Sequence, residues 1–211
     1  MQNLSEPFLQ QICNMDNALY NSEKICVGTL GPDGTSSEIA VQYLIRTFEK
    51  TNPKCRYLIK LYNTFDEVYE AMRNYKIDYA LIPAAYEKIS EFFWCPEFRP
   101  VLSFIYDTPK YGIVRKKNRS YKHKKCIKLA TCPAAHMVFD YLMKDIKQEC
   151  EIHVITTNST VESAALVMDS KADFGVTNES SYKKYGDGEM EFITNTYSSR
   201  MIWTLFKQIN D

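Results

Sequence analysis

Short strand-like runs and amphipathic helical patterns alternate along most of this 211-residue chain. The strand-like runs, which are rich in apolar, β-branched and aromatic residues, lie at 25–30, 56–62, 78–82, 110–115, 127–131, 151–156, 173–177 and 201–206. The spacing of apolar residues predicts helices over 36–50, 64–75, 134–148, 160–170 and 179–185. This alternation is typical of α/β layering, in which largely parallel strands are covered by helices. The sequence therefore predicts an α/β fold, with residues 1–23 as an N-terminal extension.

A glycine-rich turn joins the first predicted strand to the first predicted helix. Residues 31–38 read Gly-Pro-Asp-Gly-Thr-Ser-Ser-Glu. Glycine lets a ligand approach the backbone closely, and the N–H groups and hydroxyls of a first helical turn can bind an anion such as a carboxylate. The spacing matches neither a dinucleotide-binding fingerprint nor a P-loop. The same residues can instead simply cap the helix, and the sequence leaves both interpretations open.

Five motifs, in order along the chain from about Cys26 to Phe206, resemble the prephenate dehydratase family. They are Gly-Pro-Asp-Gly-Thr-Ser-Ser at 31–37, Asn-Thr-Phe-Asp-Glu-Val at 63–68, Asp-Tyr-Ala-Leu-Ile-Pro at 78–83, Thr-Cys-Pro-Ala-Ala at 131–135 and Asn-Ser-Thr-Val-Glu-Ser-Ala-Ala at 158–165. Each motif is loose when taken alone. Their common order makes the joint resemblance much more specific.

The departures from that family point to one of its branches. Typical dehydratases have Glu-Asn where this chain has Ala85-Tyr86, and they end on Thr-Arg-Phe where this chain has Ser199-Arg200-Met201. These replacements are similar to the nonaromatising prephenate decarboxylases of the bacilysin pathway and related antibiotic routes. That branch also shares Asp-Thr-Pro-x-Tyr-Gly at 107–112, Thr-Asn-Glu at 177–179 and Met-x-Trp-x-Leu-Phe at 201–206. Arg200 departs from the branch and keeps the dehydratase arginine.

The resemblance implies a two-lobed fold of the type II periplasmic-binding-protein kind, as in the prephenate dehydratase catalytic domain. Lobe 1 would comprise about 24–107 and 191–211, and lobe 2 about 108–190, with the active site in the cleft between them. Only five residues follow Phe206. We therefore expect no ACT domain, the regulatory module that dehydratases commonly carry.

The resemblance also implies a reaction. The chain would convert prephenate to dihydro-4-hydroxyphenylpyruvate and CO2, with a shift of a ring double bond and retention of the C4 hydroxyl, in the biosynthesis of an antibiotic or related secondary metabolite. Such an enzyme must hold the ring still and avoid protonating the C4 hydroxyl. One alternative is a phenylpyruvate-forming dehydratase, which the hydroxyl of Ser199 keeps open. Another is a non-catalytic protein of the same architecture that binds small anions.

The candidate site residues form two groups. The catalytic candidates are Tyr86, Ser199 and Arg200. The substrate-binding candidates are Thr35, Ser36, Ser37, Thr108, Arg115, Ser159, Thr160, Asn178 and Met201. Each type of residue also has an ordinary structural interpretation, such as a helix cap, a hinge turn, a hydrogen-bonded tyrosine or a surface ion pair.

Charge and cysteine content argue against several classes of partner. Lysine plus arginine and aspartate plus glutamate both number 26, so the chain has no global attraction to nucleic acid or membranes. We expect the basic run at 115–125 to be a solvated loop. An anion-attracting rim and a nucleic-acid patch are the alternatives for this run, and nucleic-acid binding is the third functional alternative for the chain. Seven cysteines without a CxxC pair, and no apolar stretch of membrane-spanning length, predict a cytoplasmic protein. We expect the reaction to require no metal or organic cofactor, and the resemblance implies a homodimer as the default.

Overall fold

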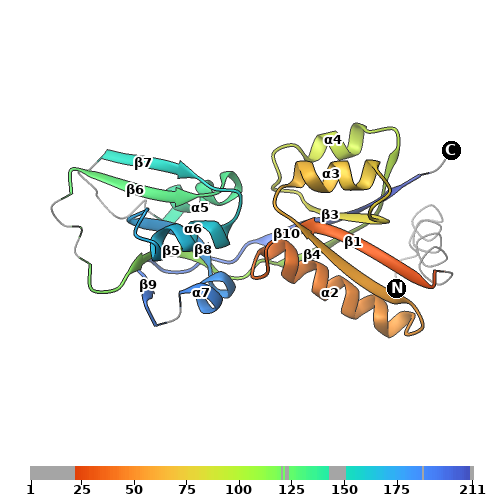
Figure 1. The fold of residues 1–211 in the computed structure, drawn as a ribbon, viewed down its shortest axis with the longest axis horizontal. Coiled ribbons are helices and arrows are strands. Elements are labelled where there is room, and N and C mark those ends of the chain that lie inside the picture. The colour runs from red at the N-terminus through yellow and green to blue at the C-terminus, as the bar shows by residue number, and fades with distance from the viewer. Residues whose placement is uncertain (1–21, 120, 122–123, 143–150, 187, 210–211) are drawn as a thin grey trace, which may run out of the picture. The chain divides into compact units, whose positions relative to one another are not determined.

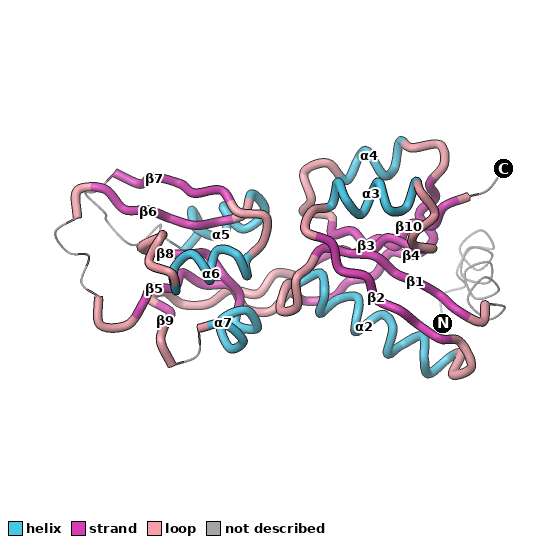
Figure 2. Tube along the Cα trace, in the orientation of Figure 1, coloured by secondary structure: helices cyan, strands magenta, loops and turns pink. Residues whose placement is uncertain are grey.

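The computed structural model describes residues 22–119, 121, 124–142, 151–186 and 188–209 (Figures 1 and 2). The chain divides into two compact units. Unit 1 contains Ile39–Tyr106 and Ile202–Asp211 together with the chain up to Leu30, and unit 2 contains Gly31–Glu38 and Asp107–Met201. Most of the predicted extension, residues 1–21, lies outside the described residues.

Unit 1 is built on a five-stranded sheet with the order β2-β1-β3-β10-β4. Its strands are β1 (Lys24–Leu30), β2 (Arg56–Tyr62), β3 (Tyr79–Pro83), β4 (Phe98–Asp107) and β10 (Arg200–Gln208). Strand β1 runs parallel to β2 and β3, whereas β10 runs antiparallel to β3. Because β10 lies between β3 and β4, the last strand of the chain is an interior strand of this sheet.

Three helices accompany this sheet: α2 (Ser36–Thr51), α3 (Phe65–Arg73) and α4 (Ile89–Trp94). Helix α3 buries Val68 and Met72, spaced four residues apart, in a cluster that includes Phe92 of α4 and Phe206 of β10. Figure 1 shows α3 and α4 on one side of the sheet and α2 on the other. The amphipathic pattern of the sequence is therefore satisfied by burial against the two faces of one sheet.

Unit 2 has a second five-stranded sheet with the order β7-β6-β8-β5-β9. Its strands are β5 (Tyr111–Lys116), β6 (Cys126–Thr131), β7 (Glu151–Thr156), β8 (Phe174–Asn178) and β9 (Met190–Phe192), and its helices are α5 (Pro133–Leu142), α6 (Thr160–Met168) and α7 (Glu179–Tyr185). Successive residues of β5, Ile113 and Val114, belong to different core clusters, the first with α5 and the second with α6. This alternation is what a strand covered on both faces requires.

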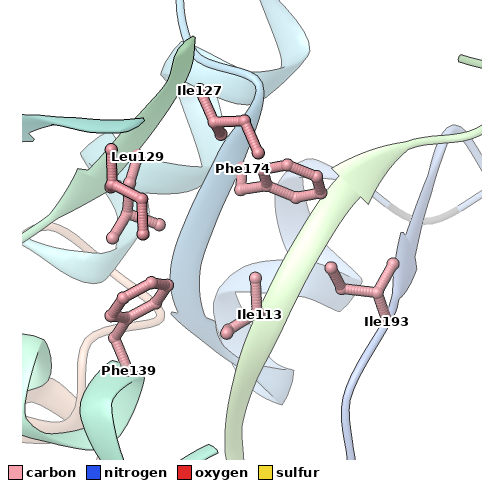
Figure 3. Close-up of a pocket in the computed structure, with 7 residues that line it drawn as sticks. Ile113, Ile127, Leu129, Phe139, Phe174 and Ile193 are labelled. Atoms are coloured by element: carbon pink, nitrogen blue, oxygen red, sulfur yellow. The ribbon is translucent and has the colours of Figure 1, made fainter. Parts of the chain in front are cut away.

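A small cavity lies within the α5 side of the unit 2 core (Figure 3). Its lining is entirely apolar and consists of Ile113, Ile127, Leu129, Phe139, Ile152, Phe174 and Ile193. No lining group can pair with a carboxylate, and burying an unpaired charge in such surroundings is very unfavourable. The cavity is therefore a packing gap of the core and no candidate for an anion site.

The two units repeat one topology. In each, the first parallel strand lies between the second and the third, and the third pairs with an antiparallel strand from elsewhere in the chain. A buttressing aspartate precedes the third strand both times: Asp78 Oδ2 accepts from the N–H of Cys26 at 2.7 Å, and Asp173 Oδ2 accepts from that of Lys128 at 3.0 Å. The amino-acid sequence shows no internal repeat, because the repetition lies in topology and in a few polar positions.

The predicted α/β fold is confirmed, with three differences in detail. The sheets are mixed rather than largely parallel, because each takes in antiparallel strands. Strand β4, helix α4 and strand β9 were not predicted. Helix α5 begins at Pro133 and is described only to Leu142, so the rest of the predicted 134–148 helix lies outside the described residues.

None of the described helices is long and apolar enough to cross a membrane.

The units also differ from the predicted lobe limits in two places. The turn Gly31–Glu38 belongs to unit 2, because its polar groups bond to residues of α7 and β5. Residues 191–201 belong to unit 2 as well, because β9 pairs with β5 and Tyr197 forms a bridge with Tyr111.

Candidate active site

Three helix starts in this structure share the same capping arrangement. Thr35 Oγ1 accepts a hydrogen bond from the N–H of Glu38 at 3.2 Å, and Ser159 Oγ accepts one from that of Glu162 at 3.2 Å. Thr64 caps α3 in the same way, at 3.1 Å from the N–H of Glu67. In each case the glutamate side chain also accepts a hydrogen bond from the N–H of the residue before the cap, which makes a variant of the capping box. Capping therefore accounts for the hydroxyls of Thr35 and Ser159.

Other hydroxyls of the same two segments enter a separate network inside unit 2. Ser36 Oγ and the Tyr111 hydroxyl are 2.5 Å apart. Thr160 Oγ1 accepts from Asn178 Nδ2 at 3.1 Å and lies 3.4 Å from Ser181 Oγ. Ser181 Oγ in turn donates to the carbonyl of Gly34 at 2.9 Å, within the glycine turn. The structure thus brings together Ser36, Thr160 and Asn178, which are three of the predicted substrate-binding residues.

Asn178 is the most constrained member of this network. It is completely buried at the end of β8, and its Oδ1 accepts from the N–H groups of Ser180 and Ser181 at 3.0 and 2.9 Å. It is therefore both the N-cap of α7 and the donor to Thr160. Helix capping is the structural interpretation that the sequence allowed for Asn178, and the structure confirms it. The same side chain also belongs to the network through its bond to Thr160.

Tyr111 connects the glycine turn to the rest of this network. Burial raises the pKa of its hydroxyl to about 12, against the opposing effect of hydrogen bonds with Ser36 and Asn178. The phenol is therefore neutral at physiological pH. All five side chains of the network, those of Ser36, Tyr111, Thr160, Asn178 and Ser181, are neutral groups that can donate a hydrogen bond.

Residues of α7 also hold the glycine turn in place. Gly34 has a φ of 93°, a conformation that strongly favours glycine. Lys184 Nζ forms an ion pair with Asp33 at 2.7 Å, and the Tyr185 hydroxyl contacts the Asp33 carbonyl at 3.4 Å. Residues of α7 thus hold the turn at Asp33 and, through Ser181, at Gly34.

A second group of predicted residues lies on two paired segments of unit 2. Thr108 donates its N–H to the Ser199 carbonyl at 2.9 Å, and Ser199 donates its own N–H to Thr108 Oγ1 at 3.1 Å. Arg200 follows, with its side chain 83% exposed and Nε 3.7 Å from Asp107 Oδ1. Tyr111 belongs to the same paired segments, since its backbone exchanges two hydrogen bonds with Tyr197.

The other predicted residues lie in different surroundings. Met201 is partly buried at the start of β10, and Ser37 is buried in the first turn of α2. Arg115 lies at the far end of β5 from Tyr111, in an ion pair with Glu191 at 2.8 Å. The structure therefore does not bring Arg115 into the network of hydroxyls.

Tyr86 belongs to unit 1, where its hydroxyl donates to Asp66 Oδ1 at 2.7 Å. Lys88 Nζ contacts the same carboxylate at 3.0 Å, and the ring of Tyr86 packs on Phe65 with 4.6 Å between centroids. The hydrogen bond from Tyr86, followed by that from Lys88, lowers the pKa of Asp66. Burial, followed by the hydrogen bond to Asp66, raises the pKa of Tyr86 well above its ordinary value.

Comparison with known proteins defines the family. The chain is 34% identical over 182 residues to a prephenate decarboxylase from Planktothrix agardhii, a match that covers 86% of this chain and 87% of that protein. The chain belongs to the prephenate decarboxylase family. A relative in this family, the prephenate decarboxylase of Bacillus subtilis, is 28% identical over 205 residues, covering 91% of this chain and 94% of the relative. No family model matches the chain.

Solved structures support the fold of this prephenate decarboxylase family member. Prephenate dehydratase from Arthrobacter aurescens, determined in complex with L-Phe, matches with a TM-score of 0.59 at 12% identity, covering 89% of this chain and 61% of that one. The periplasmic VFT2 domain of BvgS from Bordetella pertussis matches with a TM-score of 0.58 at 14% identity, covering 93% of this chain and 85% of that one. These likenesses confirm the predicted two-lobed, periplasmic-binding-protein-like fold.

Two residues of this family member's polar network were not predicted from the sequence as site residues. Tyr111 stands in the Asp-Thr-Pro-x-Tyr-Gly motif, which was recognised, but a tyrosine at a strand start gives no local sign of where its hydroxyl lies. Ser181 occupies the first turn of α7, three residues after the N-cap Asn178. The sequence did carry one indication of Ser181: it is a polar residue in the first turn after a capping asparagine.

Proposed function

We propose that this chain is a prephenate decarboxylase of the nonaromatising kind. The observation that carries the proposal is its family relationship over 86% of the chain. The exchange of the dehydratase Glu-Asn pair for Ala85-Tyr86 supports the same conclusion, because it removes an acid and an amide from the position where dehydratases carry them. The reaction releases CO2 and gives dihydro-4-hydroxyphenylpyruvate.

The chemistry sets two requirements for the protein. Loss of the ring carboxylate as CO2 leaves an electron pair, which shifts a ring double bond and is quenched by a proton on carbon. The C4 hydroxyl must therefore not be protonated, because its departure as water would produce the aromatic product. The neutral hydroxyl and amide groups of the unit 2 network support this proposal, since they can hold a carboxylate by hydrogen bonds without offering a strong acid.

Within this proposal, the predicted residues divide into those that bind prephenate and those that act on its ring. Ser36, Thr160 and Asn178 bind a carboxylate of prephenate, and Arg200 pairs with a carboxylate through its planar guanidinium. Ser199 and Tyr86 are the hydroxyl groups proposed to act on the ring. Thr35, Ser37, Thr108, Arg115, Ser159 and Met201 remain proposed substrate-binding residues.

The mass of the product tests this function directly. Purified protein mixed with prephenate is expected to release CO2 and form a product that keeps the oxygen of the C4 hydroxyl. Mass spectrometry and the ultraviolet spectrum distinguish this product from phenylpyruvate, which has lost both CO2 and water. Phenylpyruvate as the main product would establish the dehydratase alternative, and unchanged prephenate that is nevertheless bound would establish the binding protein.

A substitution at Ser37 tests the glycine turn. Ser37→Ala is expected to weaken prephenate binding by about 1–3 kcal/mol, the range for a hydrogen bond to a charged group, while unfolding remains cooperative. The measurement is the KM for prephenate together with a thermal unfolding curve. A lower melting temperature with unchanged KM and kcat would assign Ser37 to the stability of α2 alone.

The biological setting is a further proposal. The resemblance to the bacilysin branch supports a role in the biosynthesis of an antibiotic or related secondary metabolite. The buried thiols of Cys26 and Cys55 support a cytoplasmic location, where cysteines stay reduced. We also propose a homodimer, on the precedent of the family alone, and sedimentation equilibrium of the purified chain tests it.

A further inference from the structure

We infer that Tyr111 is a positioning residue of the substrate site: its hydroxyl fixes the orientation of Ser36 in the glycine turn relative to Asn178 and Thr160. This inference rests on the proposed function, because it assigns Tyr111 a role in binding prephenate through those residues. Tyr111 stands in the shared Asp-Thr-Pro-x-Tyr-Gly motif but is not among the site residues predicted from the sequence.

The first observation is the connectivity of the network. The glycine turn and the α6–β8 region lie more than 100 residues apart in the chain, and Tyr111 lies between them in the sequence. Its hydroxyl is 2.5 Å from Ser36 Oγ, and a hydrogen bond with Asn178 influences its pKa. Asn178 then donates to Thr160. The Tyr111 hydroxyl therefore links the glycine turn to the α6–β8 region, the two segments predicted to bind carboxylates.

The second observation is that Tyr111 is itself firmly placed. Its backbone exchanges hydrogen bonds with Tyr197, at 2.7 and 2.8 Å, and its register on β5 sets it opposite Asn178 of β8. Its ring packs at the edge of the α5-side core cluster, near Cys132. A serine hydroxyl rotates freely unless a partner fixes it. The rigidly placed Tyr111 hydroxyl therefore fixes the rotation of the Ser36 hydroxyl.

A chemical argument explains why a tyrosine suits this position. The hydroxyl stays neutral far above physiological pH, so it can donate one hydrogen bond and accept others without adding charge next to an anionic substrate. A lysine or arginine here would compete with Arg200 for the carboxylates. A phenylalanine would fill the same space but leave Ser36 and Asn178 without this partner.

A double-mutant cycle tests whether Tyr111 acts through Ser36. Tyr111→Phe is expected to lower kcat/KM for prephenate about tenfold, mainly by raising KM, because a preoriented hydrogen-bond donor to the carboxylate is lost. In the Ser36→Ala background the same change is expected to lower kcat/KM less than about threefold, since the hydroxyl that Tyr111 orients is already absent. Equal losses in both backgrounds, or no loss in either, would overturn the inference.

Tyr182→Phe is the matched control. The hydroxyl of Tyr182 donates to the Met190 carbonyl at 3.1 Å in the same unit, and Met190 is not a member of the network. Its removal is expected to leave kcat/KM unchanged and to act additively with Ser36→Ala. A loss of activity in this control similar to that of Tyr111→Phe would show that any hydrogen-bonded, partly buried tyrosine hydroxyl of unit 2 has this effect, and the inference would fail.

A spectroscopic measurement separates this inference from the proposed function. In protein labelled with carbon-13 at the tyrosine Cζ atoms and dissolved in a mixture of H2O and D2O, a protected hydroxyl gives two isotope-shifted signals. The signal of Tyr111, identified by its loss in Tyr111→Phe, is expected to be such a pair in the wild-type protein and to collapse to a single signal in Ser36→Ala. This result does not require turnover. An absent pair would overturn the inference even if prephenate is decarboxylated, whereas a pair without turnover would refute only the proposed function.

Discussion

Replacing Asn178 by alanine is expected to lower the free energy of unfolding by about 1.5–5 kcal/mol. The substitution removes two contributions to stability, and their costs add up. The side chain caps α7 by accepting from the N–H groups of Ser180 and Ser181, and the loss of an N-cap costs about 0.5–2 kcal/mol. It also donates to Thr160 Oγ1 in a fully buried position, where an unsatisfied partner costs about 1–3 kcal/mol. Urea denaturation followed by circular dichroism measures the change.

Two further variants separate these contributions. Thr64→Ala removes a cap of the same kind from α3 in unit 1, with a partner distance of 3.1 Å and no link to the polar network, and should cost about 1 kcal/mol. Asn178→Ser keeps a capping hydroxyl but is too short to replace the amide, so its cost should fall between the two. If Asn178→Ala is no more destabilising than Thr64→Ala, the bond to Thr160 contributes nothing to stability.

Replacing Arg200 by lysine is expected to lower kcat/KM by about 10- to 100-fold and to leave stability within about 0.5 kcal/mol. Stability should not change because the side chain is 83% exposed and its ion pair with Asp107 spans 3.7 Å, a geometry in which such pairs contribute little. Activity should fall because lysine is a point charge and cannot reproduce the two parallel hydrogen bonds of a guanidinium with a carboxylate.

Arg73 provides a matched control for this substitution. It pairs with Glu97 at 3.8 Å, and its side chain is 48% exposed. Arg73→Lys should therefore change neither activity nor stability. Wild-type kinetics in both Arg200→Lys and Arg200→Ala would remove Arg200 from the catalytic proposal and leave the polar network of unit 2 as the better candidate.

The fold was largely predictable because its strands and helices carry strong local patterns. Strands β2 and β7 begin and end where the sequence predicts. Strand β4 was missed because Arg99-Pro100 interrupts its apolar pattern. Proline lacks the N–H that an interior strand must donate, but β4 is an edge strand, where this loss is tolerated. The direction and order of the strands depend on contacts between distant segments, which periodicity does not encode.

The candidate site was predictable in its residue types but not in its connections. A threonine or serine after a strand can cap a helix or bind an anion, and both uses require the same side chain. In the structure the hydroxyls divide by position: Thr35 and Ser159 cap, whereas Ser36 and Thr160, one residue later in each case, face the network. The link through Tyr111 joins residues 75 positions apart, and no local pattern could have indicated it.

The interior position of β10 determines the order in which the protein can fold during synthesis. Strands β5 to β9 all lie between Tyr111 and Phe192, so they leave the ribosome before β10 has been made. The sheet of unit 1 must wait for β10, which places Trp203 and Phe206 in the core and pairs Thr204 with Ile82, 122 residues earlier. Contacts over such separations slow folding because a long loop must close first. The unit that is translated first is therefore completed last, and until then the edge of β3 that pairs with β10 lacks its partner, which is the kind of unpaired strand edge that promotes aggregation.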